Sequence, residues 1–527
     1  MGVSLRALRA LLLLLGFYVL GLFVLGVFVG VEFAVYHWTR PAIALKLGIP
    51  LALLAVPVVR GMFLFRTPKG EGESGLPVTE AQQPQLWVTV RETAEAAGTR
   101  PPDEIVLVGS VNAAVSEDAR LLGLVPGRRR LYLGIPLMTG LTEIQLRAVL
   151  AHEFGHYDNA DTRLMALTMR GRHSVARTVN SFWEKAEKEV EKETDRQERR
   201  VEKAVRKGRK AKEVDVSGAG GRYRQMAKPF IAYGKFYLRA TQNTARRQEL
   251  AADRTAARVA GRDAAASALR EVAVLDATHD FYLDGYATLG AAAGVLPPHG
   301  QYYGGLRHLL AEPVRQSELD GLRRELPEDE PSPYDAHPPM RERVRLIEAL
   351  PDDGRGEQPQ GRPAMALLHD PDRVCAELES ATFAPRALAM RRADWPELVH
   401  VGLHAHATAA AEPLRHAIAR VTGGEPALRA FLEAVDADAG ALERAADLLP
   451  GGRDVLRPGL EHLLVLELVD AGLAWWELSW SGPARLHLPE GFEEAIPGAV
   501  ESLLEVRGLS ATVALRSLLP TAPATTV

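Results

Sequence analysis

Cysteine is almost absent from this chain, with Cys375 the only one among 527 residues. One cysteine excludes an intramolecular disulfide framework and a cysteine-rich zinc finger, and it favours a reducing compartment. The chain also lacks a strong excess of charge of either sign, because its formal net charge is -4 with 25% charged residues. We therefore expect no nucleic-acid partner, and any zinc site must use histidine and carboxylate ligands.

Charge is also missing from residues 10–31 near the N-terminus, a run long enough to cross a bilayer as a helix. A second apolar run, from about residue 42 to 65, carries only two charges, Lys46 and Arg60. A cleaved signal peptide is the less favoured alternative, since the first run is long and no small-residue cleavage site follows it. Residues 1–66 are therefore predicted to form a transmembrane hairpin.

Basic residues around the hairpin predict its orientation. Arg6 and Arg9 precede the first run, Arg66 and Lys69 follow the second, and the turn between them contains only Arg40. Positive charge favours the cytoplasmic side of a membrane. We expect a cell-membrane protein with two spans, in contact with the lipid bilayer, whose large soluble part lies in the cytoplasm.

Two polar segments rich in glycine, proline and charge, 67–78 and 351–363, are predicted to be linkers. They delimit a domain over residues 79–350 and a separate α+β C-terminal domain of unknown role over residues 364–516. The last residues, 517–527, are typical of a disordered tail. The fold class we expect is mainly α with a small β-sheet, preceded by the transmembrane helical hairpin.

Two segments have patterns of their own. Residues 184–221 read as a charged insertion, because 21 of the 30 residues from 184 to 213 are charged. Such a segment is typical of a solvated helix or a disordered insertion, and contact of its basic end with anionic lipid is the alternative. Residues 475–488 alternate apolar and polar side chains around a Gly-Pro pair, which predicts a β-hairpin.

The segment "LTEIQLRAVLAHEFGH" (141–156) carries a helix start and, ten residues later, two histidines. Thr142 and Gln145 are spaced as a capping box, with Leu141 and Leu146 placed as a hydrophobic staple. The spacing predicts one continuous helix that carries both histidines.

His152 and His156 are four residues apart, so both imidazoles project from one side of that helix and can bind one ion. With Glu153 they form the HExxH pattern, which offers two zinc ligands and a carboxylate able to accept a proton from water. A catalytic zinc takes a third protein ligand, which we predict to be Glu249. Asp253, one turn further along the same predicted helix, is placed to hydrogen-bond the outer nitrogen of a zinc histidine.

A second histidine cluster offers a weaker alternative. "HVGLHAH" contains His400, His404 and His406, but no glutamate follows His400. Ordinary helix histidines are favoured here over a second metal site.

Four motifs resemble a family of membrane-associated zinc metallopeptidases, gluzincins that include the heat-shock protease HtpX and the CAAX prenyl protease. They are "HEFGHYDNAD", "ELAAD", "VNAAV" and "HPPMRERV", and they occur in the family's order between about residues 80 and 350. HtpX-like relatives place further membrane spans between the HExxH helix and the third ligand. Here the charged segment lies in that interval, so a membrane-enclosed chamber is not expected.

The resemblance implies one zinc ion per chain, bound by His152, His156 and Glu249. It also implies that His337 or Arg343 stabilises the developing oxyanion, and the general need for a hydrogen-bond donor there agrees. The strand at Asn112 and Ala113 is expected to pair with an extended substrate backbone.

The function we expect is a membrane-anchored zinc endopeptidase, a hydrolase of peptide or protein substrates in which Glu153 is the general base. Membrane-protein quality control is one candidate role. An alternative is a catalytically restrained or non-proteolytic scaffold or regulator that acts through the C-terminal domain. A third reading is a zymogen-like state in which the charged segment or the C-terminal domain covers the cleft.

Overall fold

The computed structural model describes most of the chain and is mostly helical with small sheets, which confirms the predicted fold class. The described residues are 3–38, 41–62, 74–117, 127–157, 162–206, 216–326, 338–355, 361–424, 426–438, 440–449, 451–505 and 512–520.

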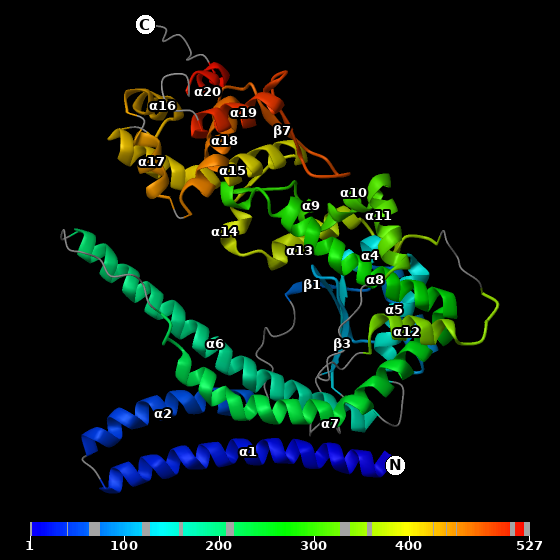
Figure 1. The fold of residues 1–527 in the computed structure, drawn as a ribbon. Coiled ribbons are helices and arrows are strands. Elements are labelled where there is room, and N and C mark those ends of the chain that lie inside the picture. Colours follow the sequence, from blue (N-terminus) through cyan, green and yellow to red (C-terminus); the bar gives the residue numbers. More distant parts are fainter. Residues whose placement is uncertain are drawn as a thin grey trace.

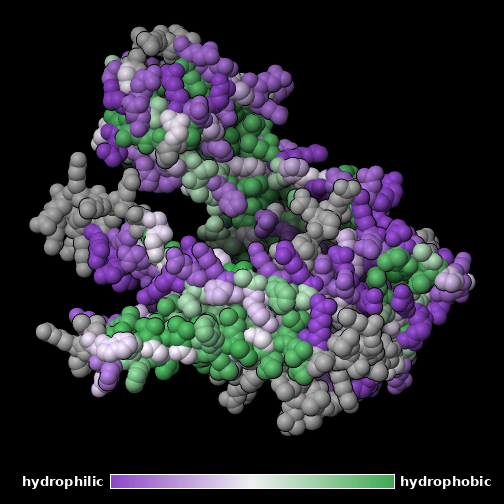
Figure 2. Space-filling model, turned by 60° about the horizontal axis from the view of Figure 1, so that its bottom comes forward, coloured by the Kyte–Doolittle hydropathy of each residue, from purple (hydrophilic) through white to green (hydrophobic). Residues whose placement is uncertain are grey.

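Two apolar helices, α1 (Val3–Trp38) and α2 (Pro41–Met62), form an antiparallel hairpin along one side of the molecule (Figure 1). Both are long and apolar enough to cross a membrane. The hairpin leaves large apolar side chains exposed, among them Phe23 at 67% and Phe33 at 68% of their surface. Figure 2 shows the resulting apolar face.

A four-stranded sheet has the order β1-β2-β4-β3. Its strands are β1 (Gly75–Val78), β2 (Glu104–Val108), β3 (Ala113–Glu117) and β4 (Arg129–Gly134), and only β2 and β4 run parallel. The predicted linker 67–78 is wrong at its end, because residues 75–78 pair with β2 as an edge strand. The other edge is β3, which includes most of the predicted "VNAAV" strand.

Helices α3 (Pro84–Ala97), α4 (Ile135–Gly140) and α5 (Glu143–Gly155) share a core with this sheet. Apolar residues of β2 and β4 are fully buried in that core, as are Leu146, Leu150 and Phe154 of α5. The apolar side of α5 is thereby held against the sheet layer, which leaves the side with the histidines facing another element.

Two long antiparallel helices, α6 (Thr162–Arg206) and α7 (Gly221–Ala260), pack against each other and against the hairpin. Phe17, Phe182 and Phe230 are fully buried where these helices meet. The predicted charged insertion 184–221 is not a separate unit, because residues 184–206 continue α6; residues 207–215 lie outside the described part. On α7, buried residues recur every three or four positions, at 223, 227, 230, 234, 237, 241, 245 and 249. Glu249 therefore lies on the inward face of α7.

The remaining elements of the domain follow α8 (Arg262–Tyr282). They are a π-helix (Leu283–Ala287), a 3-10 helix (Ala291–Ala293), β5 (Val295–Leu296), α9 (Gln301–Gly304), α10 (Leu306–Ala311), α11 (Pro313–Arg324) and α12 (Met340–Glu348). Of these, α12 is the one that reaches the site described below.

The polar segment 351–363 does not separate two hydrophobic cores. Ala364, Val374 and Leu378 are buried in the core of the four-stranded sheet, and the Ala364 amide donates to the Leu141 carbonyl. These residues belong to a 3-10 helix (Ala364–Leu367) and to α13 (Pro371–Thr382). The predicted start of the C-terminal domain at residue 364 therefore falls inside the first core.

A second core begins at Ala407 and is almost wholly helical. The elements beyond α13 are α14 (Pro385–Leu388), β6 (Arg391–Arg392), α15 (Trp395–Thr422), α16 (Leu428–Ala437), α17 (Gly440–Asp447), α18 (Arg453–Asp470), β7 (Trp475–Glu477), β8 (Arg485–His487), α19 (Phe492–Glu505) and α20 (Val513–Leu518). The antiparallel pair β7–β8 confirms the predicted hairpin. Leu518 and Leu519 are buried in this core, so the predicted disordered tail cannot begin at residue 517; residues 521–527 lie outside the described part.

Candidate metal centre

The helix that carries both histidines begins as predicted. The Gln145 amide donates to Thr142 Oγ1 at 3.4 Å, and the Thr142 amide donates to Gln145 Oε1 at 2.9 Å. This capping box satisfies two amide groups at the helix start. Leu141 and Leu146 are both buried beside it.

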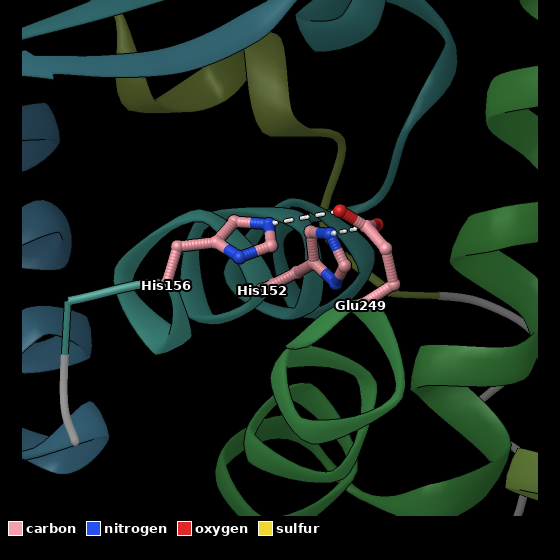
Figure 3. Close-up of side chains that lie close together, drawn as sticks. All are labelled: His152, His156 and Glu249. Atoms are coloured by element: carbon pink, nitrogen blue, oxygen red, sulfur yellow. Dashed lines mark ion pairs between the residues drawn. The ribbon is translucent and has the colours of Figure 1, made fainter. Parts of the chain in front are cut away.

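Three side chains from two helices converge at the C-terminal end of α5 (Figure 3). Nε2 of His152 lies 3.6 Å from one carboxylate oxygen of Glu249, and Nε2 of His156 lies 3.7 Å from the other. Their ligand atoms all lie within 4.8 Å of one another. The structure therefore brings together the three residues predicted as ligands, across almost a hundred positions of sequence.

Close contact between α5 and α7 makes this convergence possible. A Cβ atom placed on Gly155 would lie only 3.1 Å from the Ala252 Cα atom and 3.0 Å from the Thr255 Cβ atom. Most side chains at position 155 would therefore push α7, and Glu249 with it, away from the histidines.

The donor set fits a zinc ion. Two ligand atoms that each lie about 2.1 Å from one ion at the tetrahedral angle are separated by about 3.4 Å. The measured separations of 3.6 and 3.7 Å are close to this value. Two imidazoles and one carboxylate are also the ligand types expected for a catalytic zinc.

Asp253 lies behind His152, as predicted. Its Oδ1 atom is 3.0 Å from Nδ1 of His152, the nitrogen that points away from Glu249. Arg343 of α12 donates to both oxygens of Asp253, from Nη2 at 2.6 Å and from Nε at 3.0 Å. Asp253 is 2% exposed and Arg343 is 6% exposed, so this two-bond ion pair is shielded from water.

The charges of these residues support one another. Burial by itself raises the pKa of Asp253, but hydrogen bonds with Arg343 and His152 outweigh it and lower that pKa. Burial by itself lowers the pKa of His152, but its contacts with Asp253 and Glu249 raise it to about 9. In the metal-free protein His152 therefore carries a proton at neutral pH, held between two carboxylates.

The predicted catalytic residues are only partly placed by the structure. Glu153 is half-buried on α5, directly beside His152. Arg343 was expected to stabilise an oxyanion, but its main contact is Asp253, and its Nη2 lies 3.4 Å from Nδ1 of His152. His337 lies outside the described residues.

The predicted substrate strand lies at the edge of the sheet near the histidines. Asn112 is exposed, and Ala113 is the first residue of the edge strand β3. The Gly134 amide donates to the Asn112 carbonyl at 2.7 Å. An edge strand presents one row of backbone groups away from its sheet, as pairing with a peptide requires.

Sequence reasoning missed Tyr157. Its hydroxyl donates to the Val115 carbonyl of β3 at 2.7 Å, and the Arg129 guanidinium lies 4.6 Å from its ring centre. Burial raises the pKa of Tyr157 to about 12, so this hydroxyl is a donor at any physiological pH. The one sequence signal that could have indicated Tyr157 is its position as an aromatic residue directly after the second histidine.

The second histidine cluster does not form a metal site in the described part of the chain. His404 pairs with Asp470 at 2.9 Å, and His400 Nδ1 accepts a hydrogen bond from the Trp476 amide at 3.3 Å. Among the described residues, His152, His156 and Glu249 are the one group of three that could hold an ion.

Comparison with known families supports a metallopeptidase. The model of peptidase family M48 matches residues 80–350, about half of the chain. The chain belongs to peptidase family M48, the family of HtpX and the CAAX prenyl protease. No curated protein matches it.

Proposed function

We propose that this protein is a membrane-anchored, zinc-dependent endopeptidase. The observation that carries the proposal is the convergence of His152, His156 and Glu249, with Asp253 on the outer nitrogen of His152. A histidine that binds a metal needs a partner on its outer nitrogen to fix its orientation, and Asp253 is in that place. A cluster of acids and histidines with only a structural role would not need the HExxH glutamate, Glu153.

His152, His156 and Glu249 would hold the zinc ion, which would supply Lewis acidity to make water more acidic and to polarise the scissile carbonyl. Glu153 accepts the proton of the attacking water on a carboxylate oxygen and then donates it to the leaving amine nitrogen. Its position beside His152 on the same helix keeps this carboxylate close to the ligands.

Asp253 and Arg343 orient the site. Asp253 accepts the Nδ1 proton of His152, which turns Nε2 toward Glu249. Arg343 holds Asp253 by two hydrogen bonds and adds a positive charge behind His152. Stabilisation of the oxyanion falls to His337 and to the charge of Arg343.

The substrate is an extended peptide that pairs with β3 at Ala113. Backbone pairing gives affinity that depends little on side chains. We further propose that α1 and α2 span the cell membrane and that the catalytic part lies in the cytoplasm, because basic residues flank the hairpin.

Three matched variants test the proposal. Glu153→Gln is expected to bind about one zinc ion per chain but to lose peptide hydrolysis by a factor of about 100 or more. Glu249→Ala is expected to lose the metal. Glu143→Gln, on the same helix and paired with Arg147, serves as the control and is expected to keep both properties. Zinc is measured by elemental analysis and hydrolysis with labelled casein. Wild-type turnover by the Glu153→Gln variant would refute the catalytic assignment.

A further inference from the structure

The hydrogen-bonding pattern of β3 shows which of its backbone groups face the open edge. In an antiparallel pair, residues alternate between bonding to the partner strand and pointing away from it. Asn112 accepts a bond from Gly134 of β4, so Ala114 and Ser116 also direct their backbone groups toward β4. Ala113 and Val115 direct theirs to the edge of the sheet.

The side chain of Tyr157 already uses one of these edge groups. Its hydroxyl is bonded to the Val115 carbonyl, so the phenol ring lies against the edge two residues beyond Ala113. A carbonyl oxygen can accept a second bond, but the ring occupies the space in which a paired strand would continue.

The ring is held in place from both sides. Tyr157 directly follows His156, and its backbone amide donates to the Phe154 carbonyl of α5 at 2.8 Å. Arg129 lies over the ring and is itself anchored by Glu117 at 3.0 Å and by the Arg100 carbonyl at 2.6 Å. At 5% exposure, Arg129 has little freedom to move away.

We propose that Tyr157 is a specificity-determining residue that ends the row of backbone hydrogen bonds which β3 offers to a substrate. An extended peptide pairs with Ala113, and its further residues in the direction of Val115 leave the sheet. On that side the enzyme recognises only a short stretch of peptide, whatever its side chains. This inference rests on the proposed pairing of substrate with β3.

The test measures peptide affinity without cleavage. Zinc-loaded, full-length Glu153→Gln protein is the parent, and the probes are labelled valine-threonine peptides, lengthened two residues at a time from either end. For the parent protein, peptide affinity is expected to stop rising after the first added residues when the peptide is extended toward Val115. Extension from the other end is not limited in this way. Adding Tyr157→Leu or Tyr157→Ala removes both the hydroxyl and the ring, so the Val115 carbonyl can accept a peptide amide. Extension toward Val115 is then expected to increase affinity about 2- to 12-fold, the value of one backbone hydrogen bond.

Tyr286→Phe is the matched control, because the Tyr286 hydroxyl donates to the Ser479 carbonyl at 2.8 Å, in contact with the β7–β8 hairpin. It should leave the length dependence of the parent unchanged. Zinc content shows that the site is intact. The Leu variant, which keeps an apolar side chain against Arg129 but not the ring, must show the gain even where the Ala variant is unstable. An equal change in affinity for all peptide lengths would show that Tyr157 has only a structural role, and this result would overturn the inference. Absence of binding for every peptide, together with absence of hydrolysis by the wild type, would instead reject the proposed function itself.

Discussion

His152 shows how one histidine is held in place and in one charge state by its neighbours. Glu249 faces one of its ring nitrogens and Asp253 the other, while Arg343 keeps Asp253 ionised. Each of these groups is buried, and none would be stable there without the others, since a lone buried charge is costly. The residues therefore form a cooperative unit even without a bound metal.

The pKa of about 9 predicts a pH dependence of metal binding. A metal must displace the proton of His152, so zinc affinity should rise about tenfold per pH unit from neutral pH and level off above pH 9. Calorimetry in buffers of different ionisation enthalpy measures the released proton. Asp253→Asn removes the main partner that raises this pKa, so this variant should release less of that proton at neutral pH. An affinity that did not change over this range would contradict the prediction.

At this scale the sequence predicts which side chains share one face of each helix. The spacing of His152 and His156, and that of Glu249 and Asp253, follows from one turn of helix. Tyr157 could not be found in this way, because its partner Val115 lies on a strand whose position relative to α5 depends on tertiary packing.

Helix α7 joins two parts of the molecule. Its first half packs against the apolar hairpin, and its second half carries Glu249 and Asp253. The helix is continuous over 40 residues, so its position against α5 sets the position of Glu249. Contact at Gly155 determines how close the two helices come.

Gly155→Val should therefore impair the metal site without touching a ligand. The added methyl groups meet Ala252 and Thr255, and overpacking of this kind typically costs about 1–3 kcal/mol. We expect a loss of zinc affinity of about tenfold or more, measured by competition with a chelator. Gly321→Val on α11 has open space around its Cβ position and is the control. Equal zinc affinities for the two variants would rule out this role of the helix contact.

The elements themselves were predicted unevenly. The helix start at Thr142 and the hairpin at 475–488 follow from local signals, namely side-chain caps and alternation. Residues 184–206 of the charged segment are helical, as the solvated-helix reading predicted, and Ala186 is the one buried residue among those described there. Val175 and Phe182, on the part of α6 before this segment, pack against α7 and the hairpin together with Ala186.

The whole molecule is layered. The apolar hairpin lies along one side, α6 and α7 cover it, and the sheet with the candidate site and then the C-terminal helices follow (Figure 1). The C-terminal region is tied to the peptidase part by aromatic packing, with Trp480 stacked on Tyr286 at 4.6 Å and against Trp395 at 5.1 Å. This contact crosses the predicted domain boundary.

The exposed apolar face of the hairpin predicts how the protein is held by a bilayer. Burial of large side chains such as Leu12, Phe23 and Phe33 in lipid is independent of salt, unlike attraction between charges. Full-length protein in vesicles should stay with the membrane through high-salt and alkaline washes and be released by detergent. Release by salt alone would show that the hairpin is not inserted.

The sequence by itself determined the helical elements, the apolar hairpin and the spacing of the candidate ligands, because these depend on periodicity and on neighbours within a few residues. Tertiary structure alone decided the distance between α5 and α7, the occupation of the β3 edge by Tyr157, and the place where the first core ends. These features arise from close packing between segments that are far apart in the chain. The distances between such segments cannot be read from the spacing of residues along the sequence.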